Sequence, residues 1–321
     1  MPDSSVIRSN KVPIDLEVLK GNATRLRKER TVSRVFQFAA VLSVVISAAI
    51  ILSLFGEALS FLRIRFRLDD ISALWSPTGW FPRRGAFDIK TIVAGTMVVS
   101  AIAMVVATPL GLGAAIYLSE YAKPRLRRWL KPILEVLAGI PSVVLGFFAL
   151  TWISPEIVQS LWGNATLFNM AAAGIAVGVL ITPLVASVTE DALRSVPHSL
   201  REASYGMGAR KRTTTLRVVF PAAVSGIVAA LILGISRAIG ETMIVAIVSG
   251  ATAGSAFTLD PTGTGQTMTA AMTSLAIGSD QVRGQEGTFQ SLYFVGLLLF
   301  FMTLFLNIAS ERFVRRVRQS Y

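Results

Sequence analysis

The sequence contains no cysteine and only one histidine, His198. Without thiols it can form neither a disulfide nor a cysteine-held iron–sulfur cluster, and thiol catalysis is excluded. A single histidine also argues against a zinc site. Neither a Ser/His/Asp set nor a pair of carboxylates suited to hydrolysis stands out. We therefore expect no catalytic residue, no metal and no cofactor on this chain.

The nucleotide-binding pattern Gly-x-x-x-x-Gly-Lys-Ser/Thr is missing as well. The backbone amides and the lysine of that loop hold the phosphates of ATP in many ATPases. This chain is therefore not expected to be an enzyme, and any ATP hydrolysis that it depends on has to take place on another chain.

Charge is scarce in this sequence. Of its 321 residues 16% are charged and 53% are hydrophobic, and the mean hydropathy is +0.60. Soluble domains carry about 25% charged residues. Residues 35–55 and 91–119 contain no charged side chain at all. A run of about 20 such residues is long enough to cross the hydrocarbon layer as a helix, which indicates a membrane protein.

Six apolar runs predict an all-α, polytopic membrane protein with six transmembrane helices. Because largely polar residues precede the first run, and because it is longer than the core of a signal peptide, we expect the first helix to stay in the mature protein. In the fourth run, Gly174-x-x-x-Gly178 allows a neighbouring helix to approach closely. The runs cover 35–55, 91–118, 132–153, 167–188, 218–249 and 291–310.

The net charge of +12 is interpreted as an orientation signal and not as a sign of nucleic-acid binding. If the N-terminus is cytoplasmic, the inner segments hold 23 Lys and Arg residues and the outer loops hold seven. Six of those seven lie in the first outer loop, where the pattern is blurred. The positive-inside rule places both termini in the cytoplasm.

These runs predict the organisation of the chain. The parts are a cytoplasmic tail (1–34), a first transmembrane helix with an outer loop (35–90), a transmembrane core (91–310) and a basic cytoplasmic tail (311–321). The core contains one long cytoplasmic loop over 190–221. Whether residues 1–34 lie on the inner leaflet or are disordered is left open by their sequence.

The cytoplasmic loop predicts a short helix that starts near Pro197. Proline suits the first turn of a helix, and Ser199-x-x-Glu202 has the form of a capping box. Gly206 and Gly208 are placed to end the helix. A second helical stretch is expected to follow and to run back into the membrane at Pro221. A simpler interpretation, a basic linker that touches only lipid headgroups, remains the alternative.

A motif in this loop resembles the EAA loop of ABC importer permeases. Glu202-Ala203-Ser204, then Gly208, then Val218-Val219-Phe220-Pro221 follow that family's Glu-Ala-Ala, three residues, Gly, nine residues, Ile-x-Leu-Pro, with three conservative departures. In that family the helix bearing the motif docks on a separate ATPase subunit. The resemblance implies an ATPase-coupling role for Ser199, Glu202, Ala203, Ser204 and Gly208.

The fifth run carries two ionisable residues, Arg237 and Glu241, four apart on what we expect to be one helix face. Charges at membrane depth are costly and usually functional. Arginine suits an oxyanion, and the neighbouring Ser236 and Thr242 could add hydroxyl contacts. Glu241 could accept a hydrogen bond from protonated phosphate, which sulfate cannot offer. An ion pair that only fixes the helix register is the alternative.

The sequence around these charges is similar to the phosphate-specific (Pst) importer permeases, from about Trp75 to the C-terminus. The similar segments are Arg237-Ala-Ile-Gly-Glu-Thr-Met243, Leu137-Ala-Gly-Ile-Pro-Ser-Val-Val144 and Pro109-Leu-Gly-Leu-Gly-Ala-Ala-Ile-Tyr-Leu-Ser-Glu-Tyr121. Met243 favours the C-type permease (PstC) over the A-type (PstA). The resemblance implies a type I ABC importer permease fold in a bacterial inner membrane and a transport role for Arg237 and Glu241.

The resemblance also implies partners. They are a homologous second permease (PstA-like), two ATPase subunits (PstB-like) that hold ATP and Mg, and an extracytoplasmic phosphate-binding protein (PstS-like). We expect the outer segments 68–90, with Trp75 and Trp80, and 250–290 to receive that binding protein. The alternative for these segments is flexible loops without a partner.

Several functions compete with phosphate import. Within the class, the chain could import another oxyanion such as sulfate or molybdate, or be the A-type phosphate permease. Outside it, a secondary transporter independent of ATP would usually show inverted repeats, which we do not find. A membrane receptor that only reports phosphate is a third possibility.

Overall fold

A computed structural model describes residues 23–67, 72–76, 78–250, 254–277 and 287–317, and it separates the chain into two units, Met1–Ser53 and Leu54–Tyr321. The described part of the first unit belongs to α2 (Ala23–Arg67), a continuous helix that contains the first predicted run. Its side chains from Lys28 to Ser53 are all exposed. Most of the expected cytoplasmic tail and the last four residues of the basic tail lie outside the described residues.

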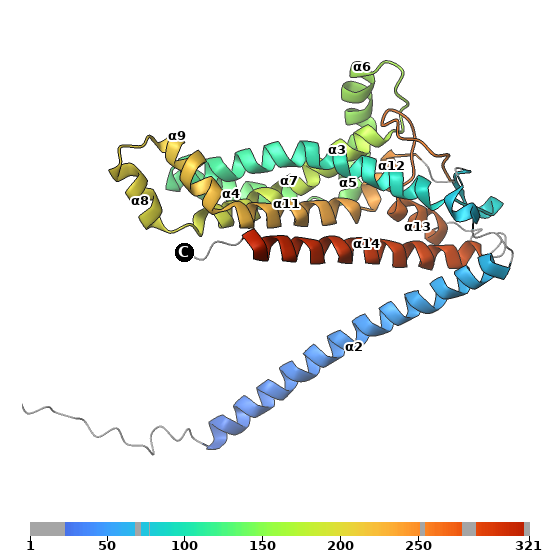
Figure 1. Ribbon diagram of the computed structural model, residues 1–321, viewed down its shortest axis with the longest axis horizontal. Helices are drawn as coiled ribbons and strands as arrows, with labels where there is room; N and C mark the ends of the chain where they lie inside the picture. The colour runs from blue at the N-terminus through green and yellow to red at the C-terminus, as the bar shows by residue number, and fades with distance from the viewer. Residues whose placement is uncertain (1–22, 68–71, 77, 251–253, 278–286, 318–321) are drawn as a thin grey trace, which may run out of the picture. The chain divides into compact units, whose positions relative to one another are not determined.

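The second unit is built almost entirely of helices (Figure 1). Its longer helices are α3 (Ile89–Ile116), α4 (Pro124–Ala138), α7 (Met170–Arg194), α11 (Val224–Ile239) and α14 (Thr288–Val317). The shorter ones are α5 (Ser142–Phe148), α6 (Gln159–Leu161), α8 (His198–Gly206), α9 (Lys211–Thr214), α10 (Phe220–Ala222), α12 (Met243–Val248) and α13 (Met268–Ile277). Stretches of π-helix occupy η3 (Tyr117–Tyr121), η4 (Ala149–Val158) and η5 (Thr215–Val219), and 3-10 turns occupy η1 (Ser72–Trp75) and η2 (Pro82–Arg84).

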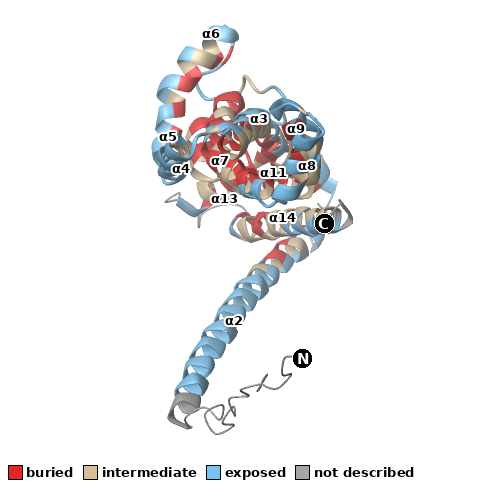
Figure 2. Cartoon of the chain, turned by 90° about the vertical axis from the view of Figure 1, so that its left-hand side faces the viewer, coloured by how far each residue is buried: buried red, intermediate tan, exposed pale blue. Residues whose placement is uncertain are grey.

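The centre of the second unit is the contact between α3 and α7, where Figure 2 shows the buried residues gathered. The two backbones approach closely because glycines of α7 face larger side chains of α3. A Cβ at Gly174 would lie 2.6 Å from the Cβ of Ile102, and one at Gly178 would lie 2.7 Å from the Cβ of Val106. The close helix approach predicted from Gly174-x-x-x-Gly178 is therefore confirmed.

The third membrane span differs from the prediction. Helix α4 ends at Ala138, and the apolar helix that could cross a membrane covers Ser142–Leu161 instead of 132–153. The break falls at Gly139–Pro141, because glycine is a poor helix residue and proline has no N–H to donate. Helix α4 is amphipathic, with Lys131 and Glu135 on a polar face, and it packs along α7.

The fifth run, predicted as one helix over 218–249, is also broken. The helical stretch Lys211–Ala222 meets α11 at an angle of 70°, just after Pro221. Helix α11 then ends at Ile239, and the non-helical residues Gly240 to Thr242 precede α12. Within the described residues, five helices are long and apolar enough to cross a membrane, or six if the bent pair forms one span.

The outer segments contribute core as well as surface. The strands β1 (Trp80–Phe81) and β2 (Ala86–Phe87) pair antiparallel, and Trp80 exchanges backbone hydrogen bonds of 2.8 and 3.1 Å with Ser255. Trp80 is fully buried beside Phe61 and Phe87, whereas Trp75 is 62% exposed. Trp80 is therefore a core residue and not part of a landing surface, because its side chain is buried in one apolar cluster with Phe61 and Phe87. Much of 264–277, including Met268, is buried too.

A first prediction follows from the α3–α7 contact. Gly178→Ala places a methyl group 2.8 Å from the carbonyl oxygen of Ala103 as well as against Val106, so the helices have to separate. We expect a loss of about 1–3 kcal/mol in stability, measured as a lower melting temperature of the purified protein. Gly113→Ala is the matched control, since a Cβ there meets nothing within 4 Å. An equal effect of both changes would contradict the packing argument.

Candidate functional site

The expected short helix is present as α8, which begins at His198 directly after Pro197. Pro197 is the N-cap and no side chain caps the helix, so the predicted capping box between Ser199 and Glu202 does not form. Ser199 is already the second residue of the helix, so it cannot be the N-cap. Pro197 takes that position instead. Glu202 and Ala203 are exposed, and no residue of α8 is buried.

The end of α8 follows the prediction. Gly208 adopts a left-handed φ of +78°, its N–H donates to the carbonyl of Tyr205 at 2.9 Å, and the N–H of Ala209 donates to the carbonyl of Ser204 at 3.1 Å. These two bonds form a Schellman motif, which satisfies the last carbonyls and fixes the exit direction. A residue with a side chain would be strained at Gly208.

Ser204, which departs from the EAA pattern, has a structural partner. Its Oγ lies 2.9 Å from Oγ1 of Thr214, which is fully buried in α9. The hydroxyl pair ties α8 to the following helix. Glu202 and Ala203 of α8 and its C-cap residue, Met207, are exposed.

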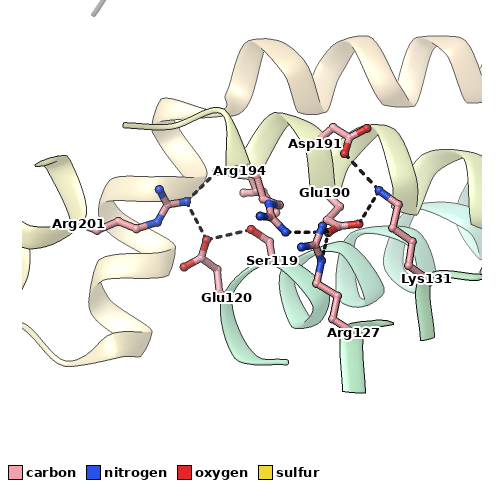
Figure 3. A network of polar contacts seen from close by, with 9 residues as sticks. Ser119, Glu120, Arg127, Lys131, Glu190, Asp191, Arg194 and Arg201 are labelled. Carbon is pink, nitrogen blue, oxygen red and sulfur yellow. Dashed lines mark hydrogen bonds and ion pairs between the residues drawn. The ribbon is translucent and has the colours of Figure 1, made fainter. Parts of the chain in front are cut away.

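Arg201 fastens α8 to η3, which continues α3, and to the C-terminal end of α7. Its guanidinium donates to the carboxylate of Glu120 in η3 at 3.0 Å. It also donates to the carbonyl of Leu193 in the last turn of α7 at 2.8 Å and to that of Val196, just after α7, at 2.6 Å. The side chains of Arg201 and Glu120 are only 12% and 5% exposed. Figure 3 shows the two pointing toward each other, with Ser119 donating to Glu120. A planar arginine with three acceptors holds these elements in one orientation.

We call the bonds of Arg201 to Glu120 and to the end of α7 the Arg201 clamp. Beside it, the fully buried carboxylate of Glu190 lies within ion-pair distance of cations on α4 and α7 (Figure 3). Glu190 accepts from Nε of Arg127 at 2.7 Å, and its Oε1 lies 2.5 Å from a terminal nitrogen of the same guanidinium. Lys131 and Arg194 stand farther away, at 3.6 and 3.9 Å. Glu190 thus joins the amphipathic helix α4 to the central helix α7.

The predicted substrate residues Arg237 and Glu241 do not share a helix face. Arg237 lies in the last turn of α11, whereas Glu241 lies in the break and accepts from the backbone N–H groups of Met243 and Ile244 at 3.2 and 3.3 Å. The carboxylate therefore caps α12, which satisfies amides that the broken helix leaves free. In the described part of the chain Arg237 forms no ion pair with Glu241, so the register-pair alternative is not supported.

The neighbouring hydroxyls point elsewhere. Ser236 donates to Oδ1 of Asn307 on α14 at 3.0 Å, and Thr242 donates to the carbonyl of Gly240 at 3.1 Å. The carbonyl freed at Glu241 accepts from Thr269 of α13 at 2.7 Å. Arg237, one of the four predicted substrate residues, lines a cavity of about 310 Å³ between α4, α7 and α11.

Sequence reasoning missed most of this polar network. Glu120 stands in a quoted family segment and Arg201 directly precedes Glu202, but nothing in their spacing links residues 81 positions apart. Glu190 directly follows a long apolar run of α7. This position is the available signal, because a carboxylate at the edge of an apolar run needs a partner when it is buried.

Comparison with known proteins gives one consistent family. Residues 107–319 match the model of the binding-protein-dependent transport system inner membrane component. A probable ABC transporter permease protein of Bacillus subtilis is 35% identical over 76% of this chain and 76% of its own length. The phosphate transport system permease protein PstC 1 of Mycobacterium tuberculosis is 34% identical over 71% of this chain and 72% of its own length.

Solved structures agree on the fold. The MetNI methionine ABC transporter, in an inward-facing conformation, matches 72% of this chain and 94% of its own chain with a TM-score of 0.51 and 22% identity. A bacterial ABC transporter involved in the import of the acidic polysaccharide alginate matches 89% of this chain and 99% of its own chain, with a TM-score of 0.58 and 15% identity. At these identities the likeness concerns the fold, which is that of a type I ABC importer permease.

The buried carboxylate generates a second prediction. Glu190→Gln leaves Arg127, whose side chain is 27% exposed, facing a neutral amide, so we expect a loss of about 1–3 kcal/mol in stability, measured by thermal unfolding in detergent. Glu311→Gln is the matched control, because its i,i+4 pair with Arg315 is exposed on both sides and such pairs contribute about 0.5 kcal/mol or less. Equal melting temperatures for the two variants would refute a structural role for Glu190.

Proposed function

Because the chain belongs to the family of binding-protein-dependent transport system inner membrane components, we propose that it is a permease subunit of an ATP-driven importer of inorganic phosphate. The observation that carries the choice of phosphate is its identity of about one third, over most of both chains, with permeases named for phosphate transport. The position of Arg237 beside a cavity supports the choice, because a guanidinium suits a phosphate oxyanion.

The proposed assembly has a division of labour. This chain forms half of the pathway, and a homologous A-type permease forms the other half. Two ATPase subunits hold ATP and Mg, and an extracytoplasmic binding protein delivers phosphate at the outer face of a bacterial inner membrane. The exposed Trp75 and Leu259, 62% and 61% exposed, offer apolar contacts for that delivery.

Coupling to the ATPase would pass through α8. Glu202, Ala203 and Met207 form the exposed contact face, while Ser199 lies in the first turn. The Schellman end at Gly208 and the Arg201 clamp keep the helix from rotating on its own. Movement imposed on α8 would therefore reach the inner ends of α3 and α7 directly, because the connection consists of charged and backbone hydrogen bonds.

The role of Arg237 is tested by charge reversal. In the assembled complex we expect Arg237→Glu to reduce phosphate uptake at least tenfold, because a carboxylate repels the anion that the guanidinium would attract. Uptake of labelled phosphate into vesicles, energised by ATP and supplied with the binding protein, is the measurement. Arg312→Glu, an exposed charge reversal at the inner end of α14, should leave uptake within about twofold. Normal uptake by the Arg237→Glu complex would place the anion site elsewhere.

The clamp is tested by the ratio of transport to ATP hydrolysis. Arg201→Gln removes the ion pair with Glu120 and weakens the bonds to α7, so ATP hydrolysis should continue while phosphate uptake per ATP falls about tenfold. Glu120→Gln should have a smaller effect in the same direction, because the two carbonyl contacts of Arg201 persist. If Arg201→Gln lowers hydrolysis and uptake in equal proportion, the residue serves ATPase binding or folding and not coupling.

A further inference from the structure

Two cavities of the second unit share one wall. The larger, of about 790 Å³, lies between α4 and α8 and is bordered by Arg128, Arg194 and His198. The smaller, of about 310 Å³, lies between α4, α7 and α11 and is bordered by Arg237. Lys131 and Glu135 line both of them. Because these two residues are four apart on α4, they form one stripe that leads from the neighbourhood of α8 to Arg237.

Lys131 is held on this stripe by two ion pairs that are longer than a hydrogen bond. Its Nζ lies 3.6 Å from Oε2 of Glu190 and 3.6 Å from Oδ1 of Asp191, beyond hydrogen-bonding distance. Oε2 of Glu190 is buried and accepts no hydrogen bond from the described residues. The Lys131 side chain is long and 31% exposed, so its ammonium group can turn from these carboxylates to an anion in either cavity.

Glu135 lies beside the same cavity as Arg237, which is where the sequence predicts the carboxylate of Glu241. It is exposed, borders the same cavity as Arg237, and makes no ion pair within the described part of the chain. Glu241 is occupied with capping α12 and borders neither cavity. A carboxylate beside two cations can accept the O–H of hydrogen phosphate, whereas sulfate has no proton to donate at neutral pH.

We propose that Lys131 and Glu135 form a second oxyanion site between Arg237 and the cytoplasmic face, with Lys131 attracting the anion and Glu135 favouring protonated phosphate over sulfate. This proposal rests on the proposed function and adds two residues to its pathway. The anion passes from one cation to the next with no bond made or broken, so the site acts on binding alone.

Because the chain contains no cysteine, a single introduced thiol can be labelled selectively. Ala138→Cys places a single thiol on the wall of the smaller cavity, and Trp129→Cys places one on α4 at a residue that is 74% exposed and borders neither cavity. In the assembled complex, with the partners' cysteines replaced, a negatively charged methanethiosulfonate reagent is applied from the cytoplasmic side. Millimolar phosphate or sulfate is added as the protecting ion.

We expect phosphate to slow modification of the thiol at position 138, sulfate to slow it less, and neither to affect the thiol at position 129. Lys131→Gln should weaken protection by phosphate about tenfold, the effect of one charge-assisted contact. Glu135→Gln should make sulfate and phosphate equally protective, and Glu241→Gln should leave their difference intact. Protection that is absent, or unchanged by Lys131→Gln and Glu135→Gln, overturns the proposal.

Uptake measured in the same preparation separates this proposal from the function on which it rests. If the unmodified assembly imports phosphate but labelling does not respond to either variant, only the second oxyanion site fails. If the unmodified assembly imports no phosphate, the proposed function fails and the site falls with it.

Discussion

The close contact between α3 and α7 is the constraint on which the second unit depends. Gly174 and Gly178 let the two backbones meet where any side chain would collide with Ile102 or Val106. Between such surfaces dispersion acts at short range over many atoms, and small residues lose little side-chain entropy. The result is a closely packed pair of helices, and α8 and α4 are attached at the C-terminal end of α7 and at η3, which continues α3.

Both attachments use a buried carboxylate. Glu120, at the end of α3, binds Arg201 of the short helix α8, and Glu190, near the end of α7, binds Arg127 of the amphipathic helix α4. Each carboxylate would be costly without its partner, so each pair specifies one orientation of the attached helix. One attachment holds α8, the helix proposed to bind the ATPase, and the other holds α4 beside the proposed anion path. A single helix pair thus positions both of the elements to which a function is assigned in the proposals.

Breaks in the helices serve this arrangement. At Gly240 to Thr242 the chain gives up helical hydrogen bonds, and Glu241 and Thr269 replace them with side-chain contacts. The break ends α11 just after Arg237 and leaves that residue at the edge of a cavity. Non-helical backbone within this apolar run is tolerated because other protein groups form hydrogen bonds with its free amides and carbonyls.

Local properties of the sequence, namely apolar length, proline, glycine and a fixed spacing, were enough to predict the helical membrane class, the glycine end of α8 and the close approach at Gly174 and Gly178. The predictions of the capping box, of the third span, of an unbroken fifth span, of a shared helix face for Arg237 and Glu241, and of an exposed Trp80 were wrong. Only the tertiary structure decided that Arg201 meets Glu120 and that Lys131 and Glu135 stand between two cavities, because contacts between residues far apart in the chain depend on how helices pack, and neither periodicity nor composition encodes that packing.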